Sequence, residues 1–154
     1  QVLSGINAIQ IFDSWADLLS EDELDLFSLS YTKKITQKLK NDPITKHIPI
    51  ILFEKNPNKD ITDLIFKDLS CISLYWNSDI RILSESLKND IAIQGNLDPK
   101  VLGKSDETIQ EEVRKICSIM KGYPGFIFNL GHGITPDIEP AKVEVMIKTI
   151  REDI

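Results

Sequence analysis

The chain repeats one pattern five times: a short apolar run, followed by a segment in which apolar residues recur at helical spacing. The runs are Ala8–Phe12, Pro49–Phe53, Cys71–Tyr75, Ile91–Ile93 and Phe126–Leu130. Short apolar runs are typical of strands buried on both faces, and strands that alternate with helices form parallel sheets with right-handed crossovers. The sequence therefore predicts an α/β fold. No Gly/Ser linker or change of composition divides the 154 residues, so we expect one domain over 1–154.

Start and stop signals place the helices between these strands. Ser20 and Glu23 form a capping-box pattern for the first helix, which we expect to end at 41–43, Asn-Asp-Pro. Asp98 followed by Pro99 is an N-cap signal for a later helix, and Pro140 opens the last one. The apolar residues expected to form the buried stripes of the five helices are Leu24, Phe27, Tyr31, Ile35 and Leu39; Ile61, Leu64, Ile65 and Leu69; Ile80, Leu83 and Leu87; Ile109, Val113, Ile116 and Met120; and Val143, Met146, Ile147 and Ile150.

Charge and composition exclude several classes of partner. The net charge is −6, and the lysines are scattered among carboxylates, so we expect no nucleic acid partner. No stretch approaches the roughly 18 apolar residues that a membrane helix needs. The two cysteines, Cys71 and Cys117, have no second cysteine or histidine at metal-ligand spacing. We therefore expect no metal site, and two reduced thiols in a cytoplasmic protein.

The segment 125–140, GFIFNLGHGITPDIEP, has the layout of a functional site. A buried strand runs into Gly131, His132 and Gly133, and the carboxyl ends of parallel strands are where function collects in α/β folds. Glycine on both sides lets a ligand approach the backbone, while the imidazole supplies a hydrogen-bond partner near neutral pH. A structural role for His132 is an equal alternative. Polar residues follow three other strands, and all could converge on one mouth: Asp13 and Ser14; Glu54 and Lys55; Gln94, Gly95, Asn96 and Asp98.

Each of these polar residues also has a structural interpretation. Ser14 could bond a ligand or cap the next turn, and the sequence does not separate the two. Asp98 is favoured as the N-cap of the helix that Pro99 begins, and Gly95 and Asn96 are favoured as turn formers. Trp15 could line a cleft, but we expect it to pack.

Three blocks together resemble the carboxyl-terminal part of the uroporphyrinogen decarboxylase family. They are AIQIFDSWAD at 8–17, IQGNLDP at 93–99 and GFIFNLGHGITPDIEP at 125–140, in the family's order and at similar intervals. The resemblance implies a single (β/α)8 barrel, of which this chain would cover about the last five βα units. A whole barrel takes about 250 residues. Because the chain also begins at Gln1 and lacks a signal-peptide pattern, we expect it to be part of a longer protein.

The resemblance also implies an activity. Family members remove carbon dioxide from the four acetate side chains of uroporphyrinogen III to give coproporphyrinogen III in haem biosynthesis. They use no metal and no organic cofactor, because a protonated pyrrole ring itself serves as the electron sink. A homodimer is implied as well.

Site residues follow from the resemblance position by position. Phe12 and Ser14 fall on the family's F-x-S strand end, and His132 falls on the histidine of its NLGHG block. Ser14 and His132 would bond substrate carboxylates, and Phe12 would pack against the macrocycle. The family's other essential groups, an RQAGR segment, an aspartate and a tyrosine, lie in its amino-terminal half. We therefore assign no catalytic residue to this chain.

Two departures from the family pattern and two alternative functions remain open. Tyr75 stands where the family usually has the aspartate of an L-D-W block, and 54–57, Glu-Lys-Asn-Pro, replaces a more glycine-rich segment. One alternative is a corrinoid-linked methyltransferase, a barrel-related class that binds zinc through histidine and cysteines. The other is a non-catalytic module that keeps the fold without the chemistry.

Overall fold

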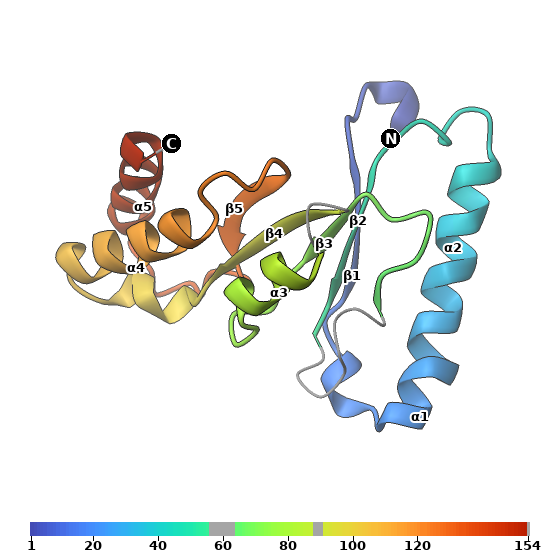
Figure 1. Ribbon diagram of the computed structural model, residues 1–154, viewed down its shortest axis with the longest axis horizontal. Coiled ribbons are helices and arrows are strands. Elements are labelled where there is room, and N and C mark those ends of the chain that lie inside the picture. The colour runs from blue at the N-terminus through green and yellow to red at the C-terminus, as the bar shows by residue number, and fades with distance from the viewer. Residues whose placement is uncertain (56–63, 88–90, 154) are drawn as a thin grey trace. The chain divides into compact units, whose positions relative to one another are not determined.

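A computed structural model describes residues 1–55, 64–87 and 91–153 (Figure 1). The chain forms two compact units, Gln1–Ser73 and Leu74–Ile154, which are described in turn. Each unit combines parallel strands with helices, as the βα repeat predicts. The expectation of one domain over 1–154 stays a prediction.

The first unit contains three parallel strands: β1 (Ile9–Asp13), β2 (Ile50–Glu54) and β3 (Cys71–Ser73). β2 lies between the other two and pairs with both. Its residues Ile50 and Leu52 are fully buried. The three apolar runs predicted as strands are confirmed within one or two residues at each end.

One long helical stretch connects β1 to β2. It follows a short 3-10 turn, η2 (Ala16–Leu18), and comprises α1 (Glu21–Leu24), the π-helical η3 (Asp25–Leu29) and α2 (Ser30–Asn41). Another 3-10 turn, η1 (Val2–Ser4), precedes β1. The capping box is confirmed: the Ser20 amide donates to Glu23 Oε2 at 2.9 Å, and the Glu23 amide donates to Ser20 Oγ at 3.4 Å. The bond from the Ser20 amide lowers the pKa of the Glu23 carboxyl, and the Ser20 hydroxyl adds to this.

The buried face of this helical stretch differs from the predicted one. Phe27, Tyr31 and Ile35 are 59%, 56% and 48% exposed, and of the predicted stripe Leu24 alone is fully buried. The residues that the helix buries are Leu24, Ser28, Leu29, Thr32 and Thr36. Periodicity shows which residues share a helix face, but the covered face depends on neighbours. Here the covered face includes Ser28, which bonds Asp13 of β1.

The second predicted helix is wrong over the residues that can be checked. Residues 65–70 form turns and irregular structure, so no helix extends to Leu69. Ile61, which was expected to begin its stripe, lies outside the described residues. Leu64 is buried nonetheless, as expected of that stripe.

The second unit contains two parallel strands, β4 (Ala92–Leu97) and β5 (Phe126–Leu130), with Asn96 opposite Asn129. Its long helices are α3 (Ile80–Leu87), α4 (Asp106–Ile119) and α5 (Pro140–Asp153). α3 and α5 occupy the predicted ranges. α5 buries Met146 and Thr149, whereas Ile147 of its predicted stripe is 40% exposed. The most deeply buried hydrophobic residues of this unit are Leu74, Ile93, Leu97, Leu102, Ile109 and Val113.

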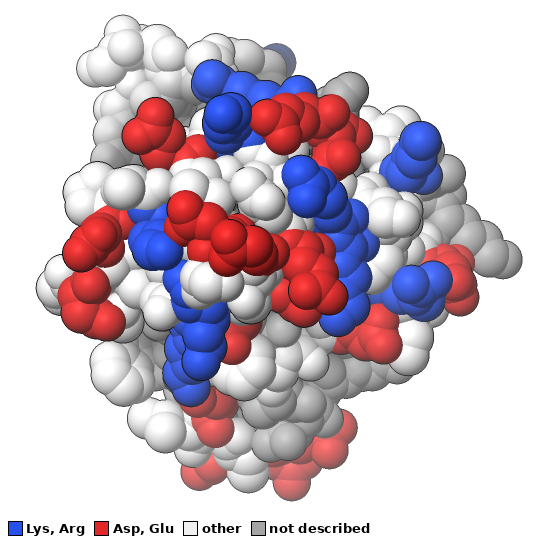
Figure 2. Space-filling model, turned by 90° about the vertical axis from the view of Figure 1, so that its left-hand side faces the viewer, with Lys and Arg blue, Asp and Glu red and all other residues white. Residues whose placement is uncertain are grey.

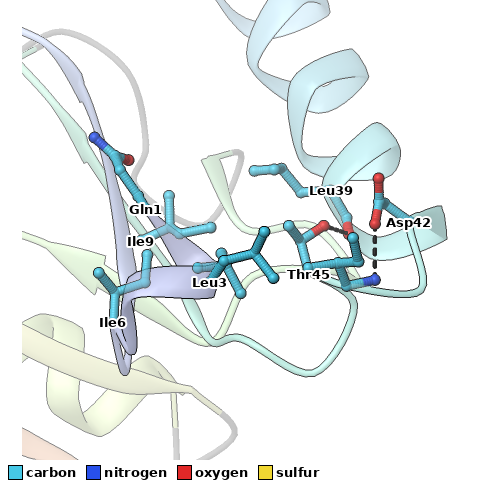
Figure 3. Close-up of a pocket in the computed structure, with 9 residues that line it drawn as sticks. Gln1, Leu3, Ile6, Ile9, Leu39, Asp42 and Thr45 are labelled. Carbon is cyan, nitrogen blue, oxygen red and sulfur yellow. Dashed lines mark hydrogen bonds between the residues drawn. The ribbon is translucent and has the colours of Figure 1, made fainter.

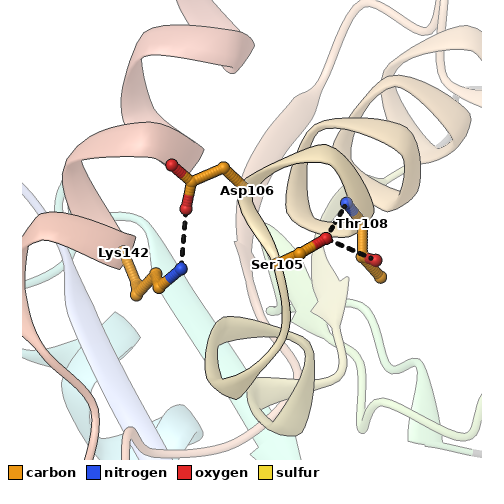
Figure 4. Close-up of polar contacts among 4 residues, drawn as sticks. All are labelled: Ser105, Asp106, Thr108 and Lys142. Atoms are coloured by element: carbon orange, nitrogen blue, oxygen red, sulfur yellow. Dashed lines mark hydrogen bonds and ion pairs between the residues drawn. The ribbon is translucent and has the colours of Figure 1, made fainter.

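The helix predicted to begin at Pro99 is two separate helices. Asp98 does cap a turn, because the Lys100 amide donates to Asp98 Oδ1 at 2.9 Å, but that turn is the 3-10 helix η5 (Pro99–Gly103). α4 starts afresh at Ser105, whose hydroxyl accepts from the Thr108 amide at 3.3 Å (Figure 4). Because Asp98 and Ser105 each cap a helix, the segment that apolar spacing predicted as one helix forms two, η5 and α4.

Ion pairs link the surfaces of α4 and α5. Lys142 Nζ lies 2.7 Å from Asp106 Oδ1 (Figure 4), and the Arg114 guanidinium contacts Asp153 at 3.4 Å. Figure 2 shows basic and acidic side chains interleaved over one face of the molecule. In the part of the chain that the structure describes, no helix has the length and apolar character needed to cross a bilayer.

Candidate functional site

Phe12 lies at the carboxyl end of β1 on the sheet face that points away from the helices. Ser28 Oγ donates to Asp13 Oδ2 at 2.5 Å, so the Asp13 side chain points toward the helical layer. Successive side chains of a strand alternate between faces, which places Phe12 on the opposite one. Its ring is 65% exposed and lies 5.9 Å from that of Phe53, its partner in the strand register. Phe12 thus offers an apolar surface at a strand end.

Ser14 follows directly and is half-buried. Among the described residues the capping alternative for Ser14 gains no support, because Trp15 is the N-cap residue of η2 and that turn has no side-chain cap. Trp15 is 74% exposed, so the expectation that it packs is wrong. Trp15 in the turn after β1 and Phe12 near the end of β1 are thus both exposed.

An ion pair between Lys55 and Asp17 lies at the same end of the first unit. Lys55 Nζ lies 2.9 Å from Asp17 Oδ2, with both side chains 23% exposed. Glu54 is only 4% exposed and stands opposite Asp13 in the register, which puts it on the helix side of the sheet. Glu54 is therefore removed from the face that carries Phe12. Residues 56 and 57 of the departure from the family pattern lie outside the described residues.

In the second unit, His132 follows β5 and is exposed. The Gly133 amide donates to His132 Nδ1 at 2.8 Å. A neutral imidazole that accepts at Nδ1 carries its proton on Nε2. This bond therefore fixes a tautomer in which His132 can donate a hydrogen bond through Nε2. The Tyr75 ring meets the imidazole edge-on, with ring centres 6.0 Å apart.

Asn96 holds the segment that carries Tyr75. Its Nδ2 donates to the Tyr75 carbonyl at 3.0 Å and to the Ser78 carbonyl at 2.8 Å. Asn96 is 6% exposed and belongs to β4, as does Gly95, so the expectation that these two residues form a turn is wrong. A Cβ on Gly95 would lie 3.3 Å from Leu74, and its φ of +141° also favours glycine.

The two glycines beside His132 have different roles. A Cβ on Gly131 would lie 2.3 Å from the Trp76 backbone nitrogen, whereas a Cβ on Gly133 would have nothing within 4 Å. The group that approaches Gly131 is thus the protein's own backbone, not a ligand as the sequence suggested. Only Gly133 leaves open space beside the imidazole.

A lysine completes this part of the second unit. Lys100 Nζ lies 5.8 Å from the centre of the Trp76 ring, and the Trp76 and Tyr75 rings are 5.3 Å apart. Lys100, Trp76, Tyr75 and His132 therefore form a contiguous row of side chains, named here the aromatic row. No local sequence pattern marks Lys100, and the row could not be predicted from the sequence because its members come from three segments of the chain.

The described residues contain no group of three or more His, Cys, Asp or Glu that could hold a metal ion. Burial raises the pKa of the Cys71 thiol to about 12, so this cysteine stays protonated near neutral pH.

Phe12 and Ser14 belong to the first unit and His132 to the second. Their convergence on one mouth stays a prediction.

A cavity of about 530 Å³ lies at the opposite, amino-terminal end of β1. Figure 3 shows its apolar lining from the start of the chain, including Leu3, Ile6 and Ile9, facing Leu39 and Thr45. Because ligands of parallel α/β folds bind at the carboxyl ends of the strands, this cavity is not part of the candidate site.

Comparison of folds defines the class of protein. The structure superposes on a methyltransferase from Methanosarcina mazei with a TM-score of 0.71, at 19% identity, over 98% of this chain and 43% of that one. Parallel strands that alternate with helices, together with this superposition, make this chain part of a (β/α)8 barrel. The family model of uroporphyrinogen decarboxylase (URO-D) matches residues 1–153. The chain belongs to the uroporphyrinogen decarboxylase family.

Curated relatives agree with this assignment. The chain is 42% identical to a uroporphyrinogen decarboxylase of Chloroherpeton thalassium, over 99% of this chain and 44% of that protein. It is 39% identical to the one of Vesicomyosocius okutanii, over 97% and 43%, and 40% identical to the one of Protochlamydia amoebophila, over 99% and 40%. The chain thus spans less than half the length of the relatives it matches.

Proposed function

We propose that the protein containing this chain decarboxylates uroporphyrinogen III at its four acetate side chains to give coproporphyrinogen III, and that residues 1–154 supply part of the active site. The observation that carries this proposal is the 42% identity over 99% of the chain to a relative named uroporphyrinogen decarboxylase. The relatives are about twice as long, so the remaining catalytic groups would lie outside these residues. No catalytic acid is assigned within them.

The local surroundings of three side chains, each taken within its own unit, support the proposal. The exposed ring of Phe12 offers a flat apolar surface for a pyrrole macrocycle. Ser14 supplies a hydroxyl beside it, and His132 supplies an Nε2 proton whose position is fixed by the Gly133 amide. Both are suitable donors to the carboxylates at the edge of a tetrapyrrole.

The chemistry requires only acid–base steps and a substrate that can accept electrons. Protonation of a pyrrole carbon makes the ring an electron sink. The electron pair of the bond to the carboxylate then moves into the ring, and carbon dioxide leaves. The former acetate carbon takes up a proton to become a methyl group, and the ring carbon loses the proton it had accepted, which restores the pyrrole. In this scheme Ser14, His132 and Phe12 hold the substrate in register with the acid. We expect no metal or organic cofactor to take part.

The decisive experiment compares two proteins: the natural-length protein, meaning the complete translation product that contains this chain, and residues 1–154 alone. Each is incubated with uroporphyrinogen III, and the products are separated after oxidation. We expect coproporphyrinogen from the natural-length protein and none from residues 1–154 alone. Failure of the natural-length protein would reject the function, and product from residues 1–154 alone would reject the claim that they hold only part of the site.

A methyltransferase is the second candidate, and the fold shared with the Methanosarcina mazei protein favours it. The corrinoid-linked class binds zinc, so roughly stoichiometric zinc in the purified natural-length protein, with methyl transfer to a thiol, would establish this alternative. A folded protein with neither activity would indicate a non-catalytic module. We further propose a cytoplasmic homodimer, which light scattering and fractionation would test.

A further inference from the structure

We propose that Lys100 is a carboxylate-binding residue of this site, at the opposite end of the aromatic row from His132. Neither the family pattern nor the residues carried over from it assign Lys100 a role. The inference rests on the proposed function for the identity of the ligand, a tetrapyrrole with peripheral carboxylates. It rests on the structure for the position of the charge.

The position of the ammonium group is the first argument. Lys100 Nζ lies 5.8 Å from the centre of the Trp76 ring, within the range of a cation–π contact. Such a contact orients a flexible side chain and reduces the entropy lost when it binds a ligand. None of the described carboxylates forms an ion pair with Lys100. Its charge is therefore held in place and available to an anion.

The strand register supplies the second argument. Leu97 of β4 stands opposite Leu130 of β5. Lys100 follows three residues after the first, and His132 two residues after the second, so both rise from the carboxyl edge of the same pair of strands. The last two strands of a (β/α)8 barrel often build an anion site at this edge.

The surface between the two residues supplies the third argument. The Trp76 and Tyr75 rings lie 5.3 Å apart, and Tyr75 meets His132 at 6.0 Å. An ammonium at one end, a donor imidazole at the other and two aromatic rings between them suit a ligand built of pyrrole rings that carry carboxylates at their edges. A net charge of −6 makes a local cation useful for holding a polyanionic substrate.

The test uses the natural-length protein and uroporphyrin, the oxidised ring, which carries the same eight carboxylates but is not decarboxylated. Equilibrium dialysis measures its binding to Lys100→Gln, with Lys104→Gln as the matched control because Lys104 is an exposed lysine at the end of the same 3-10 helix, η5. We expect Lys100→Gln to weaken binding roughly threefold to tenfold, the range for a partly exposed charged hydrogen bond. Lys104→Gln and Lys100→Arg should bind as the parent does, and Lys100→Gln should lower the salt dependence of binding.

Parent-like binding by folded Lys100→Gln, judged by its melting temperature, would overturn the inference. An equal loss in Lys104→Gln would also overturn it, because the effect would then be one of general charge. The two proposals fail separately. Lys100-dependent binding without formation of coproporphyrinogen would reject the decarboxylase function and keep Lys100, whereas decarboxylation with an unchanged KM in Lys100→Gln would reject Lys100 alone. A parent protein that does not bind uroporphyrin would reject Lys100 as a binding residue for this ligand, while the formation of coproporphyrinogen would still decide the function.

Discussion

The backbone nitrogen of Trp76 lies so close to Gly131 that a Cβ atom on Gly131 would sit 2.3 Å from it. Contact at this distance requires glycine, because the clash would be with backbone and not with the end of a flexible side chain. The same contact brings the segment with Tyr75 to the end of β5, where its ring meets His132.

Gly131→Ala should therefore destabilise the protein, by about 1–3 kcal/mol or more, as expected when a tightly packed position is overfilled. Urea unfolding of the natural-length protein measures the change. Gly133→Ala is the matched control, since open space surrounds Gly133 and alanine keeps the amide that bonds His132. Equal stability of the two variants would contradict the close approach of Trp76.

Asn96→Ala should also destabilise the protein, by about 1–3 kcal/mol, because it leaves two backbone carbonyls without their hydrogen-bond donor. These are the bonds to the carbonyls of Tyr75 and Ser78. Asn96→Asp should cost at least as much, since a carboxylate cannot donate to a carbonyl. Asn129→Ala, at the exposed register partner on β5, serves as the control. Thermal unfolding would show whether Asn96 differs from it.

Ser14→Ala and His132→Ala should each lower kcat/KM for uroporphyrinogen, by an amount equivalent to about 1–3 kcal/mol if a hydrogen bond to a carboxylate is lost. His132→Gln keeps a side-chain donor and should recover part of the loss. Steady-state rates of the natural-length protein provide the comparison. Unchanged kinetics in both alanine variants would remove these residues from the substrate site.

Cys71 should resist alkylation in the folded protein. Burial raises its pKa to about 12, so at pH 8 the reactive thiolate is a minute fraction, and this fraction grows only as the pH approaches 12. The pKa of Cys117 is also raised, by burial first and then by Asp153, but this side chain is partly exposed. Mass spectrometry after iodoacetamide treatment should find label on Cys117 before Cys71, and on both in denaturant. Rapid native labelling of Cys71 would show that it is not buried.

Ser105→Ala should destabilise the protein by about 1 kcal/mol, the usual cost of removing an N-cap hydroxyl. The Ser105 hydroxyl accepts from the Thr108 amide in the first turn of α4 (Figure 4). Ser118→Ala, at an exposed position within the same helix, should have a much smaller effect. Equal effects in denaturant unfolding would show that α4 does not depend on its cap.

Local patterns determined much of the fold. Apolar runs located all five strands, although β4 continues four residues beyond its predicted run, to Leu97. The capping box at Ser20 and the proline at 140 located two helix starts. These signals act between residues a few positions apart, so the sequence displays them directly. Local patterns did not predict which face of a helix is buried, because that depends on the elements packed against it. The helix of the first unit exposes Tyr31 and buries Ser28, since the covered face depends on contacts with β1.

The sequence by itself determined the α/β class, the resemblance to the family and the candidates Phe12, Ser14 and His132. Only the tertiary structure showed that Asn96 fixes the Tyr75 segment, that Trp76 closes on Gly131, and that Lys100 lies over Trp76. The physical reason is distance along the chain: 21 residues separate Asn96 from Tyr75. Contacts of that kind arise from strand pairing, and no short pattern of residues records them.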